Sequence, residues 1–178
     1  MNLIDRDQIV AALKRLGQLA LADGESLRLV VVGGAAMVLG YDARQATHDV
    51  DAIVLPPPDT FVVRDWARKV AAEFGWPEDW LNDAAKGFLV GISEGPILLS
   101  TPGIEVRQPS AEQLLSMKLC AWRDDVDIQD AERLLTEIAE GIDRNVVWQK
   151  ILPFLVRGRE LKARYALEDL WENTRGGN

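Results

Sequence analysis

The chain has 178 residues, 48% of them hydrophobic, which is enough to bury one sizeable core with a smaller helical appendage. Its 28 acidic and 20 basic residues give a net charge of −8, which argues against broad nonspecific adhesion to nucleic acid but does not exclude a local basic groove. A single cysteine (Cys120), a single histidine (His48), a charged N-terminus and the lack of any long apolar run exclude a disulfide framework, a zinc cluster, a signal peptide and a membrane span, so we expect a soluble cytoplasmic protein with no membrane partner.

The first half of the chain predicts helices that alternate with short strands. Apolar residues at helical spacing follow Asp5, a suitable cap, and two short β-rich segments are closed by glycine or proline. The expected elements are a helix at 5–22, a strand at 27–32, a short helix at 35–41, a strand at 48–55 and a helix from 59 or 60 to 74.

The second half predicts mainly helices. Residues 77–83 indicate a short turn, and residues 87–108 indicate two or three short strands, in GFLVGIS, PILLS and GIEVRQ. Ser110 with Gln113 forms a capping-box pattern, and Asp127 is a suitable cap for the following helix. The expected helices lie at 110–122, 127–139, 144–152 and 158–173.

These elements predict an α+β (mixed α/β) fold, in which a small mixed sheet with helices packed on it precedes a C-terminal helical bundle. We expect an α/β core at residues 1–109, a helical region at 110–174 and a disordered tail at 175–178.

Two aspartates in the second strand are the first candidate site. Residues i and i+2 of a strand share a face, so Asp49 and Asp51 lie side by side while Val50, Ala52 and Val54 face the core. Two adjacent like charges are unfavourable unless a cation lies between them, and carboxylates are ligands that Mg²⁺ prefers. The commoner explanation of an isolated Asp-x-Asp is a solvated strand end.

A double glycine ends the first strand. Gly33 and Gly34 allow close backbone approach to a phosphate at a helix start, or simply form a tight turn. Arg44 could hold a phosphate, or pair with a nearby acid such as Asp42. His48 faces away from the acid pair and is expected to be a packing residue.

A third region, residues 114–135, joins a basic residue to a run of acids. Lys118 and Trp122 share a helical face, and the turn that follows carries several aspartates. From spacing alone we favour a capped helix start with a solvated acid cluster at Asp124, Asp125, Asp127 and Asp130. The six tryptophans have no period, which favours core and interface packing over base stacking.

Taken together, these motifs resemble a known superfamily. A strand, Gly-Gly, a short helix and then R-x-x-T-x-D-h-D on the next strand resembles nucleotidyltransferases of the DNA polymerase β type. The segment MKLCAWRDDVDIQD resembles the helix-turn-helix of the small bacterial branch that includes AbiEii-type toxins. The resemblance covers roughly residues 27–135.

The resemblance implies roles for individual residues. Asp49 and Asp51 would hold Mg²⁺, Gly33 and Gly34 the triphosphate, and Arg44 and Thr47 would shape the nucleotide site. A third carboxylate would complete a two-metal site, and Glu105 is its best candidate. Lys118 and Asp127 match the branch's downstream basic and acidic positions as further catalytic residues. The chain departs from the family in having Ala35 after Gly-Gly, which loses a hydroxyl contact.

The expected function is therefore Mg²⁺-dependent transfer of a nucleoside monophosphate from an NTP to a hydroxyl of RNA, tRNA included, or of a protein. The resemblance further implies a toxin–antitoxin or phage-defence system with a cognate antitoxin-like partner. One alternative is a catalytically inactive member that binds a nucleotide or a partner. Another is a pure interaction module that uses the tryptophan-bearing helical half.

Overall fold

The computed structural model describes residues 3–123 and 125–175, and the rest of the expected tail, 176–178, lies outside the described residues. The chain forms two compact units: the α/β unit, residues 1–85 with 95–108, and the helical unit, residues 86–94 with 109–178. The expected mixed α+β class is confirmed. The division into a core at residues 1–109 and a helical region at 110–174 stays a prediction.

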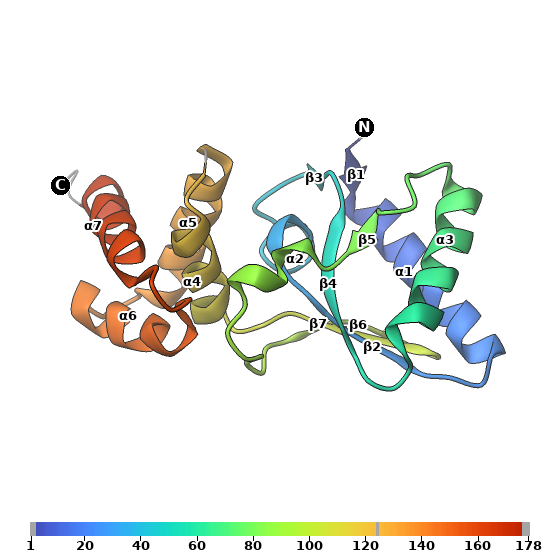
Figure 1. Ribbon diagram of the computed structural model, residues 1–178. Coiled ribbons are helices and arrows are strands. Elements are labelled where there is room, and N and C mark those ends of the chain that lie inside the picture. Colours follow the sequence, from blue (N-terminus) through green and yellow to red (C-terminus); the bar gives the residue numbers. More distant parts are fainter. Residues whose placement is uncertain (1–2, 124, 176–178) are drawn as a thin grey trace. The chain divides into compact units, whose positions relative to one another are not determined.

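A five-stranded mixed sheet, ordered β5-β4-β2-β7-β6, forms the centre of the α/β unit (Figure 1). Strand β2 pairs antiparallel with β4 and parallel with β7. The strands are β2 (Leu27–Val31), β4 (Val50–Leu55), β5 (Leu81–Asn82), β6 (Ile97–Thr101) and β7 (Ile104–Arg107).

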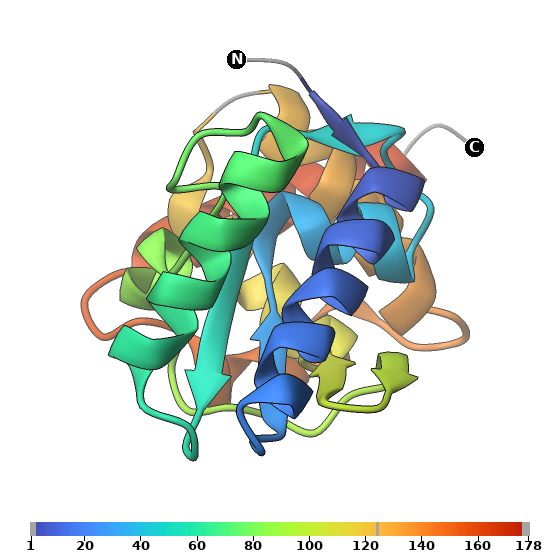
Figure 2. The same cartoon turned by 90° about the vertical axis from the view of Figure 1, so that its right-hand side faces the viewer.

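Two helices, α1 (Arg6–Ala22) and α3 (Thr60–Phe74), lie side by side on one face of this sheet (Figure 2). The expected cap is confirmed, because the Asp5 carboxylate accepts from the backbone N–H of Gln8. The Gln8 side chain accepts in turn from the backbone N–H of Asp5, which completes a capping box. Gly17 lets α1 approach β7 closely, since an added Cβ would lie 2.5 Å from Ile104 Cγ2. The face toward α1 is apolar, so the opposite face carries the polar residues of the strands.

The remaining elements of the α/β unit are short. Helix α2 (Gly33–Gly40) follows β2, and its last carbonyls at Val38 and Leu39 accept hydrogen bonds from Arg6 Nη1 at 3.0 and 2.9 Å. Strand β1 (Ile4–Asp5) pairs with β3 (Ala46–Thr47) in a two-stranded ladder that the sequence pattern did not predict. Such two-residue strands are too short to show a period.

In its described residues, the helical unit contains four α-helices: α4 (Ala111–Ala121), α5 (Asp125–Ile138), α6 (Arg144–Ile151) and α7 (Glu160–Arg175) (Figure 1). A 3₁₀ turn, η2 (Leu152–Phe154), links the last two. The predicted Ser110 cap is confirmed, because its hydroxyl accepts from Gln113 N. The capping box is incomplete, because the Ser110 N–H donates to Ser93 Oγ instead of to the Gln113 side chain. Among the described residues, no helix is long and apolar enough to cross a membrane.

The predicted strand at 87–93 is wrong. A 3₁₀ helix, η1 (Ala84–Phe88), precedes an irregular segment that the Gln113 amide holds. Gln113 Nε2 donates to the carbonyls of Val90 and Gly91, at 3.0 Å each, while Gln113 Oε1 accepts from Ser93 N at 2.7 Å. Side-chain hydrogen bonds thus satisfy a backbone that was expected to pair in a ladder.

Candidate functional site

The two aspartates of the Asp-x-Asp motif lie at the start of β4, on the sheet face opposite α1 and α3. Asp51 belongs to the strand and Asp49 directly precedes it, so the strand begins two residues later than predicted. Val50 and Ala52 are buried toward the core, as the alternation predicted. The two carboxylates therefore project from the same side of the chain.

Each carboxylate is anchored by an element that the motif does not contain. Asn82 on β5 donates from Nδ2 to Asp49 Oδ2 at 2.9 Å, and the backbone N–H of Ala85 donates to Asp51 Oδ1 at 3.1 Å. The register explains the first contact, because Asn82 pairs with Asp51 across β4 and β5. A carboxylate has about four acceptor sites, so a carboxylate can be held in position by such contacts and also bind a cation.

The double glycine lies directly against the other motif residues. Gly33 has φ +61°, and a Cβ there would lie 3.0 Å from Asp51 Oδ2. A Cβ at Gly34 would overlap Thr47 Oγ1 and lie 3.3 Å from Arg44 Nη1. The fold thus brings the four residues that the resemblance assigned to the nucleotide site together with Asp51 of the acid pair.

This loop is also the start of α2. In the described structure the N-cap residue, Val32, makes no side-chain capping hydrogen bond, and no acidic residue lies in the first turn. The first amides of a helix have no partner within the helix, and together they attract anions. The glycine loop is therefore suited chemically to a phosphate group.

The acids present fit one divalent ion better than two. Within residues 3–123 and 125–175, no group of three His, Cys, Asp or Glu side chains comes together as a metal site. Mg²⁺ is often bound by one or two carboxylates together with substrate phosphates. Asp49 and Asp51 supply such a pair.

Glu105, the expected third carboxylate, lies away from this pair. On β7 it stands opposite Arg28 of β2, whereas Val32, directly after the other end of β2, donates to Asp51 O. These positions are four residues apart, which is about 13 Å along a strand. The Glu105 carboxylate instead accepts from Arg107 Nε at 2.7 Å.

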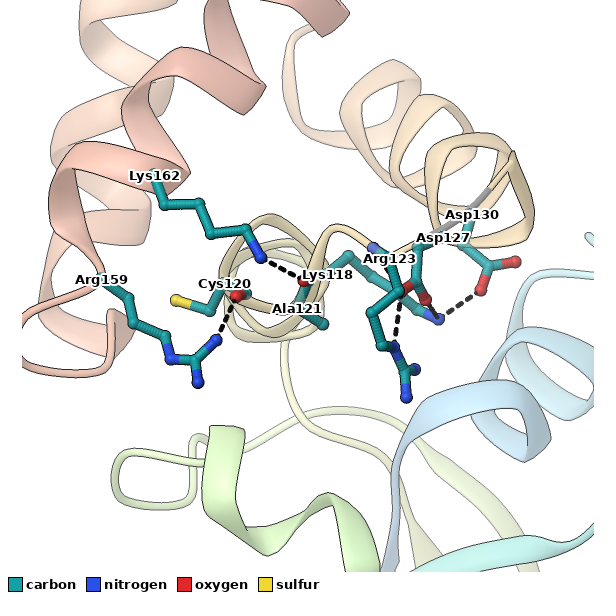
Figure 3. A network of polar contacts seen from close by, with 8 residues as sticks. All are labelled: Lys118, Cys120, Ala121, Arg123, Asp127, Asp130, Arg159 and Lys162. Carbon is teal, nitrogen blue, oxygen red and sulfur yellow. Dashed lines mark hydrogen bonds and ion pairs between the residues drawn. The ribbon is translucent and has the colours of Figure 1, made fainter.

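Lys118 and Asp127 come together in the helical unit (Figure 3). Lys118 Nζ lies 2.8 Å from Asp127 Oδ1 and 2.6 Å from Asp130 Oδ2. Asp127 and Asp130 are only 2% and 1% exposed, so a solvated cluster was wrong for these two acids. Asp127 is the third residue of α5 and not its cap. Asp124 lies outside the described residues.

The cations around Asp127 determine its charge state. Burial alone would raise the pKa of Asp127, but hydrogen bonds from Arg123 and Lys118 outweigh burial and lower it. Arg123 Nε lies 3.0 Å from Asp127 Oδ2. Asp127 is thus ionised within an ion-pair cluster that joins α4 to α5.

Two residues near the acid pair differ from what the sequence indicated. His48 is exposed, so the predicted packing role is wrong. Asn82 was not predicted, because a lone amide in the short segment WLND carries no recognisable pattern. Only strand pairing shows that it supports Asp49.

Of the tryptophans, Trp66 and Trp80 are fully buried, in agreement with core packing.

The mixed sheet, with an acid pair set against a glycine loop, places the chain among α+β proteins of the nucleotidyltransferase type. Residues 8–153 match the family described as "Nucleotidyltransferase of unknown function (DUF6036)", and the chain belongs to this family. The match supports the superfamily and does not extend to the AbiEii-like branch. No curated protein and no solved structure matches the chain.

Proposed function

We propose that the protein is a Mg²⁺-dependent nucleotidyltransferase that transfers a nucleoside monophosphate from an NTP to a hydroxyl of RNA or protein. The observation that carries this proposal is the packing of Gly33 and Gly34 against Asp51, Thr47 and Arg44. A phosphate site and a pair of metal ligands then share one edge of the sheet. Family membership supports the same class of reaction.

Each residue of the proposed site has its own role in binding or positioning. The amides at the start of α2 bind the triphosphate, and Arg44 and Thr47 shape its surroundings. Asp49 and Asp51 hold the ion, and Asn82 keeps Asp49 in position. When bound, Mg²⁺ neutralises phosphate charge and stabilises the leaving group. The catalytic role that the resemblance implies for Lys118 and Asp127 stays a prediction.

The proposed reaction has a simple balance. The acceptor oxygen forms a bond to the α-phosphorus, and the bond between that phosphorus and the β-bridging oxygen breaks. Pyrophosphate leaves with the electron pair of that bond, and the acceptor hydroxyl releases its proton. The toxin–antitoxin or phage-defence setting, with an antitoxin-like partner, belongs to this proposal through the AbiEii resemblance alone.

The test is transfer of label from α-labelled NTPs in cell extract with Mg²⁺. We expect labelled RNA or protein with the wild type and at least a hundredfold less with Asp49→Ala/Asp51→Ala, because two ligands of the reacting centre are gone. The control Asp65→Ala/Glu78→Ala removes two exposed acids that pair with Arg68 on the surface, and it should label normally. No product from the wild type, or equal labelling by the Asp49/Asp51 variant, would contradict the proposal.

One observation favours a second candidate, a member that binds nucleotide without turning it over. In the described part of the chain, two acids form the site where a two-metal enzyme has three. Calorimetry separates the candidates, because NTP binding with no transfer under any condition supports the inactive member. A pure interaction module would show no change of melting temperature with Mg²⁺ or NTP.

A further inference from the structure

The strand β7 carries two polar side chains on the same sheet face as Asp51. Ile104 and Val106 are buried on the side of α1, so Glu105 and Arg107 project to the opposite face. Residues paired across two strands share a face. Val31 stands opposite Ala52 on the face toward α1, whereas Val30 stands opposite Ile53 on the other face. Asp51, two residues before Ile53 on β4, therefore lies on the same face as Glu105 and Arg107. The three side chains therefore lie on the same face of the sheet.

Arg107 is the nearer of the two to the acid pair. It stands opposite Val30, two positions along β2 from Val32, whose N–H donates to Asp51 O. Its backbone is therefore about 7 Å along the strands and about 10 Å across them from Asp51. Glu105 lies two residues farther away. The β7 side chain closest to the proposed metal pair is a cation.

The contact with Glu105 orients this cation. Arg107 donates from Nε to Glu105 Oε1 at 2.7 Å. A guanidinium has five N–H groups, and those on its two terminal nitrogens form the fork that grips phosphate oxygens. Binding through Nε holds the side chain while it leaves that fork able to meet a ligand. The Arg107 side chain is 39% exposed, so a ligand can reach it.

Charge balance gives this arrangement a function. The charge of Asp49 and Asp51 offsets one divalent ion, so the negative charge of a bound triphosphate requires other cations. We propose that Arg107 is a triphosphate-binding residue of the nucleotide site and supplies the positive charge that a second ion brings in a two-metal enzyme. Glu105 is then the positioning residue of Arg107 and not a metal ligand. This inference rests on the proposed function.

The first test is nucleotide affinity, measured by calorimetry on the full chain with Mg²⁺ and a non-hydrolysable ATP analogue. Loss of a charge-assisted contact should weaken binding by about tenfold or more in Arg107→Gln, and Arg107→Lys should recover only part of it, because an ammonium lacks the fork. The control Arg68→Gln removes an exposed arginine of α3 and should bind as the wild type does. Equal melting temperatures of the variants would confirm that they are folded.

The second test asks whether Glu105 acts through Arg107. Glu105→Ala alone should weaken the affinity for the analogue, and the double variant Glu105→Ala/Arg107→Gln should bind no more weakly than Arg107→Gln, because contacting residues are not additive. A Glu105 that binds metal independently would instead give additive losses.

The third test counts ions by the electron paramagnetic resonance signal of Mn²⁺. With the analogue bound, the wild type should hold one tight Mn²⁺ per chain. Two tight ions, or unchanged affinity in Arg107→Gln, would overturn the role of Arg107 while leaving the proposed function intact. Failure of the wild type to bind the analogue at all would overturn both.

Discussion

Gly33 combines two constraints that only glycine satisfies together. Its φ of +61° is unfavourable for a side chain with a Cβ, and its Cα faces Asp51 so closely that a Cβ would lie 3.0 Å from Oδ2. The Gly33 backbone therefore lies closer to the Asp51 carboxylate than any residue with a side chain would allow. This approach places the amides of the helix start beside the proposed ion.

A matched pair of glycine substitutions separates these two constraints. Gly75, the C-cap of α3, has φ +68°, but nothing lies within 4 Å of a Cβ built there. We expect Gly33→Ala and Gly75→Ala each to lose about 1 kcal/mol of stability from backbone strain. Only Gly33→Ala should also weaken nucleotide and Mg²⁺ binding, because its Cβ displaces Asp51. Unfolding by urea and calorimetry of the same two variants measure both effects, and equal binding by the two would contradict the assigned role of Gly33.

At the scale of elements, a buried ion cluster joins α4 to α5. Lys118 on α4 neutralises Asp127 and Asp130 on the first two turns of α5, and its side chain is 10% exposed. A buried charge without its partner is costly, so the three groups depend on one another. The cluster thus specifies how these two helices pack.

Removal of the lysine should expose that dependence. We expect Lys118→Met to lower the free energy of unfolding by about 3–5 kcal/mol, because it leaves two carboxylates buried without their shared cation. Lys150→Met is the control: Lys150 pairs with Glu112 at 3.6 Å, is 46% exposed and should change stability by less than about 1 kcal/mol. Similar denaturant midpoints for the two variants would show that the cluster contributes no more than a surface pair.

At the scale of the whole molecule, the single cysteine reports on the integrity of the helical unit. Cys120 is fully buried in α4, and burial raises the pKa of its thiol, although Arg159 and Lys162 act in the opposite direction. Its own carbonyl and that of Ala121 accept hydrogen bonds from Arg159 and Lys162 at 3.0 and 2.6 Å (Figure 3). The reactive thiolate is therefore both scarce and inaccessible in the folded protein.

We predict that a maleimide at pH 7 modifies Cys120 only when the helical unit opens. Mass spectrometry should find the native chain unmodified over a period in which the chain in 6 M guanidinium reacts fully. Lys118→Met should react faster than the wild type, because it weakens the packing of α4 and α5. Rapid modification of the native wild type would contradict the described burial.

Features that depend on neighbours in the chain could be predicted from the sequence. Asp5 and Ser110 cap their helices through contacts three residues away, and Asp49 and Asp51 share a face because strand side chains alternate. The predicted strand at 87–93 failed because Gln113, about twenty residues farther along, satisfies that backbone. Local pattern cannot show a partner so far away in the chain.

The chemistry of the site depended on pairing and packing. Strand register places Asn82 beside Asp49, Glu105 beside Arg28 and Arg107 nearer to Asp51, and no local pattern specifies register between strands so distant in the chain. Burial of Asp127 likewise required α4 and α5 to pack. The acid that the sequence pattern indicated as solvated is therefore buried and forms an ion pair with Lys118. The sequence by its own spacing identifies the acids and glycines of the motif, because their geometry is local. Only the tertiary structure decides which cations and amides surround them, because those partners meet through long-range contacts.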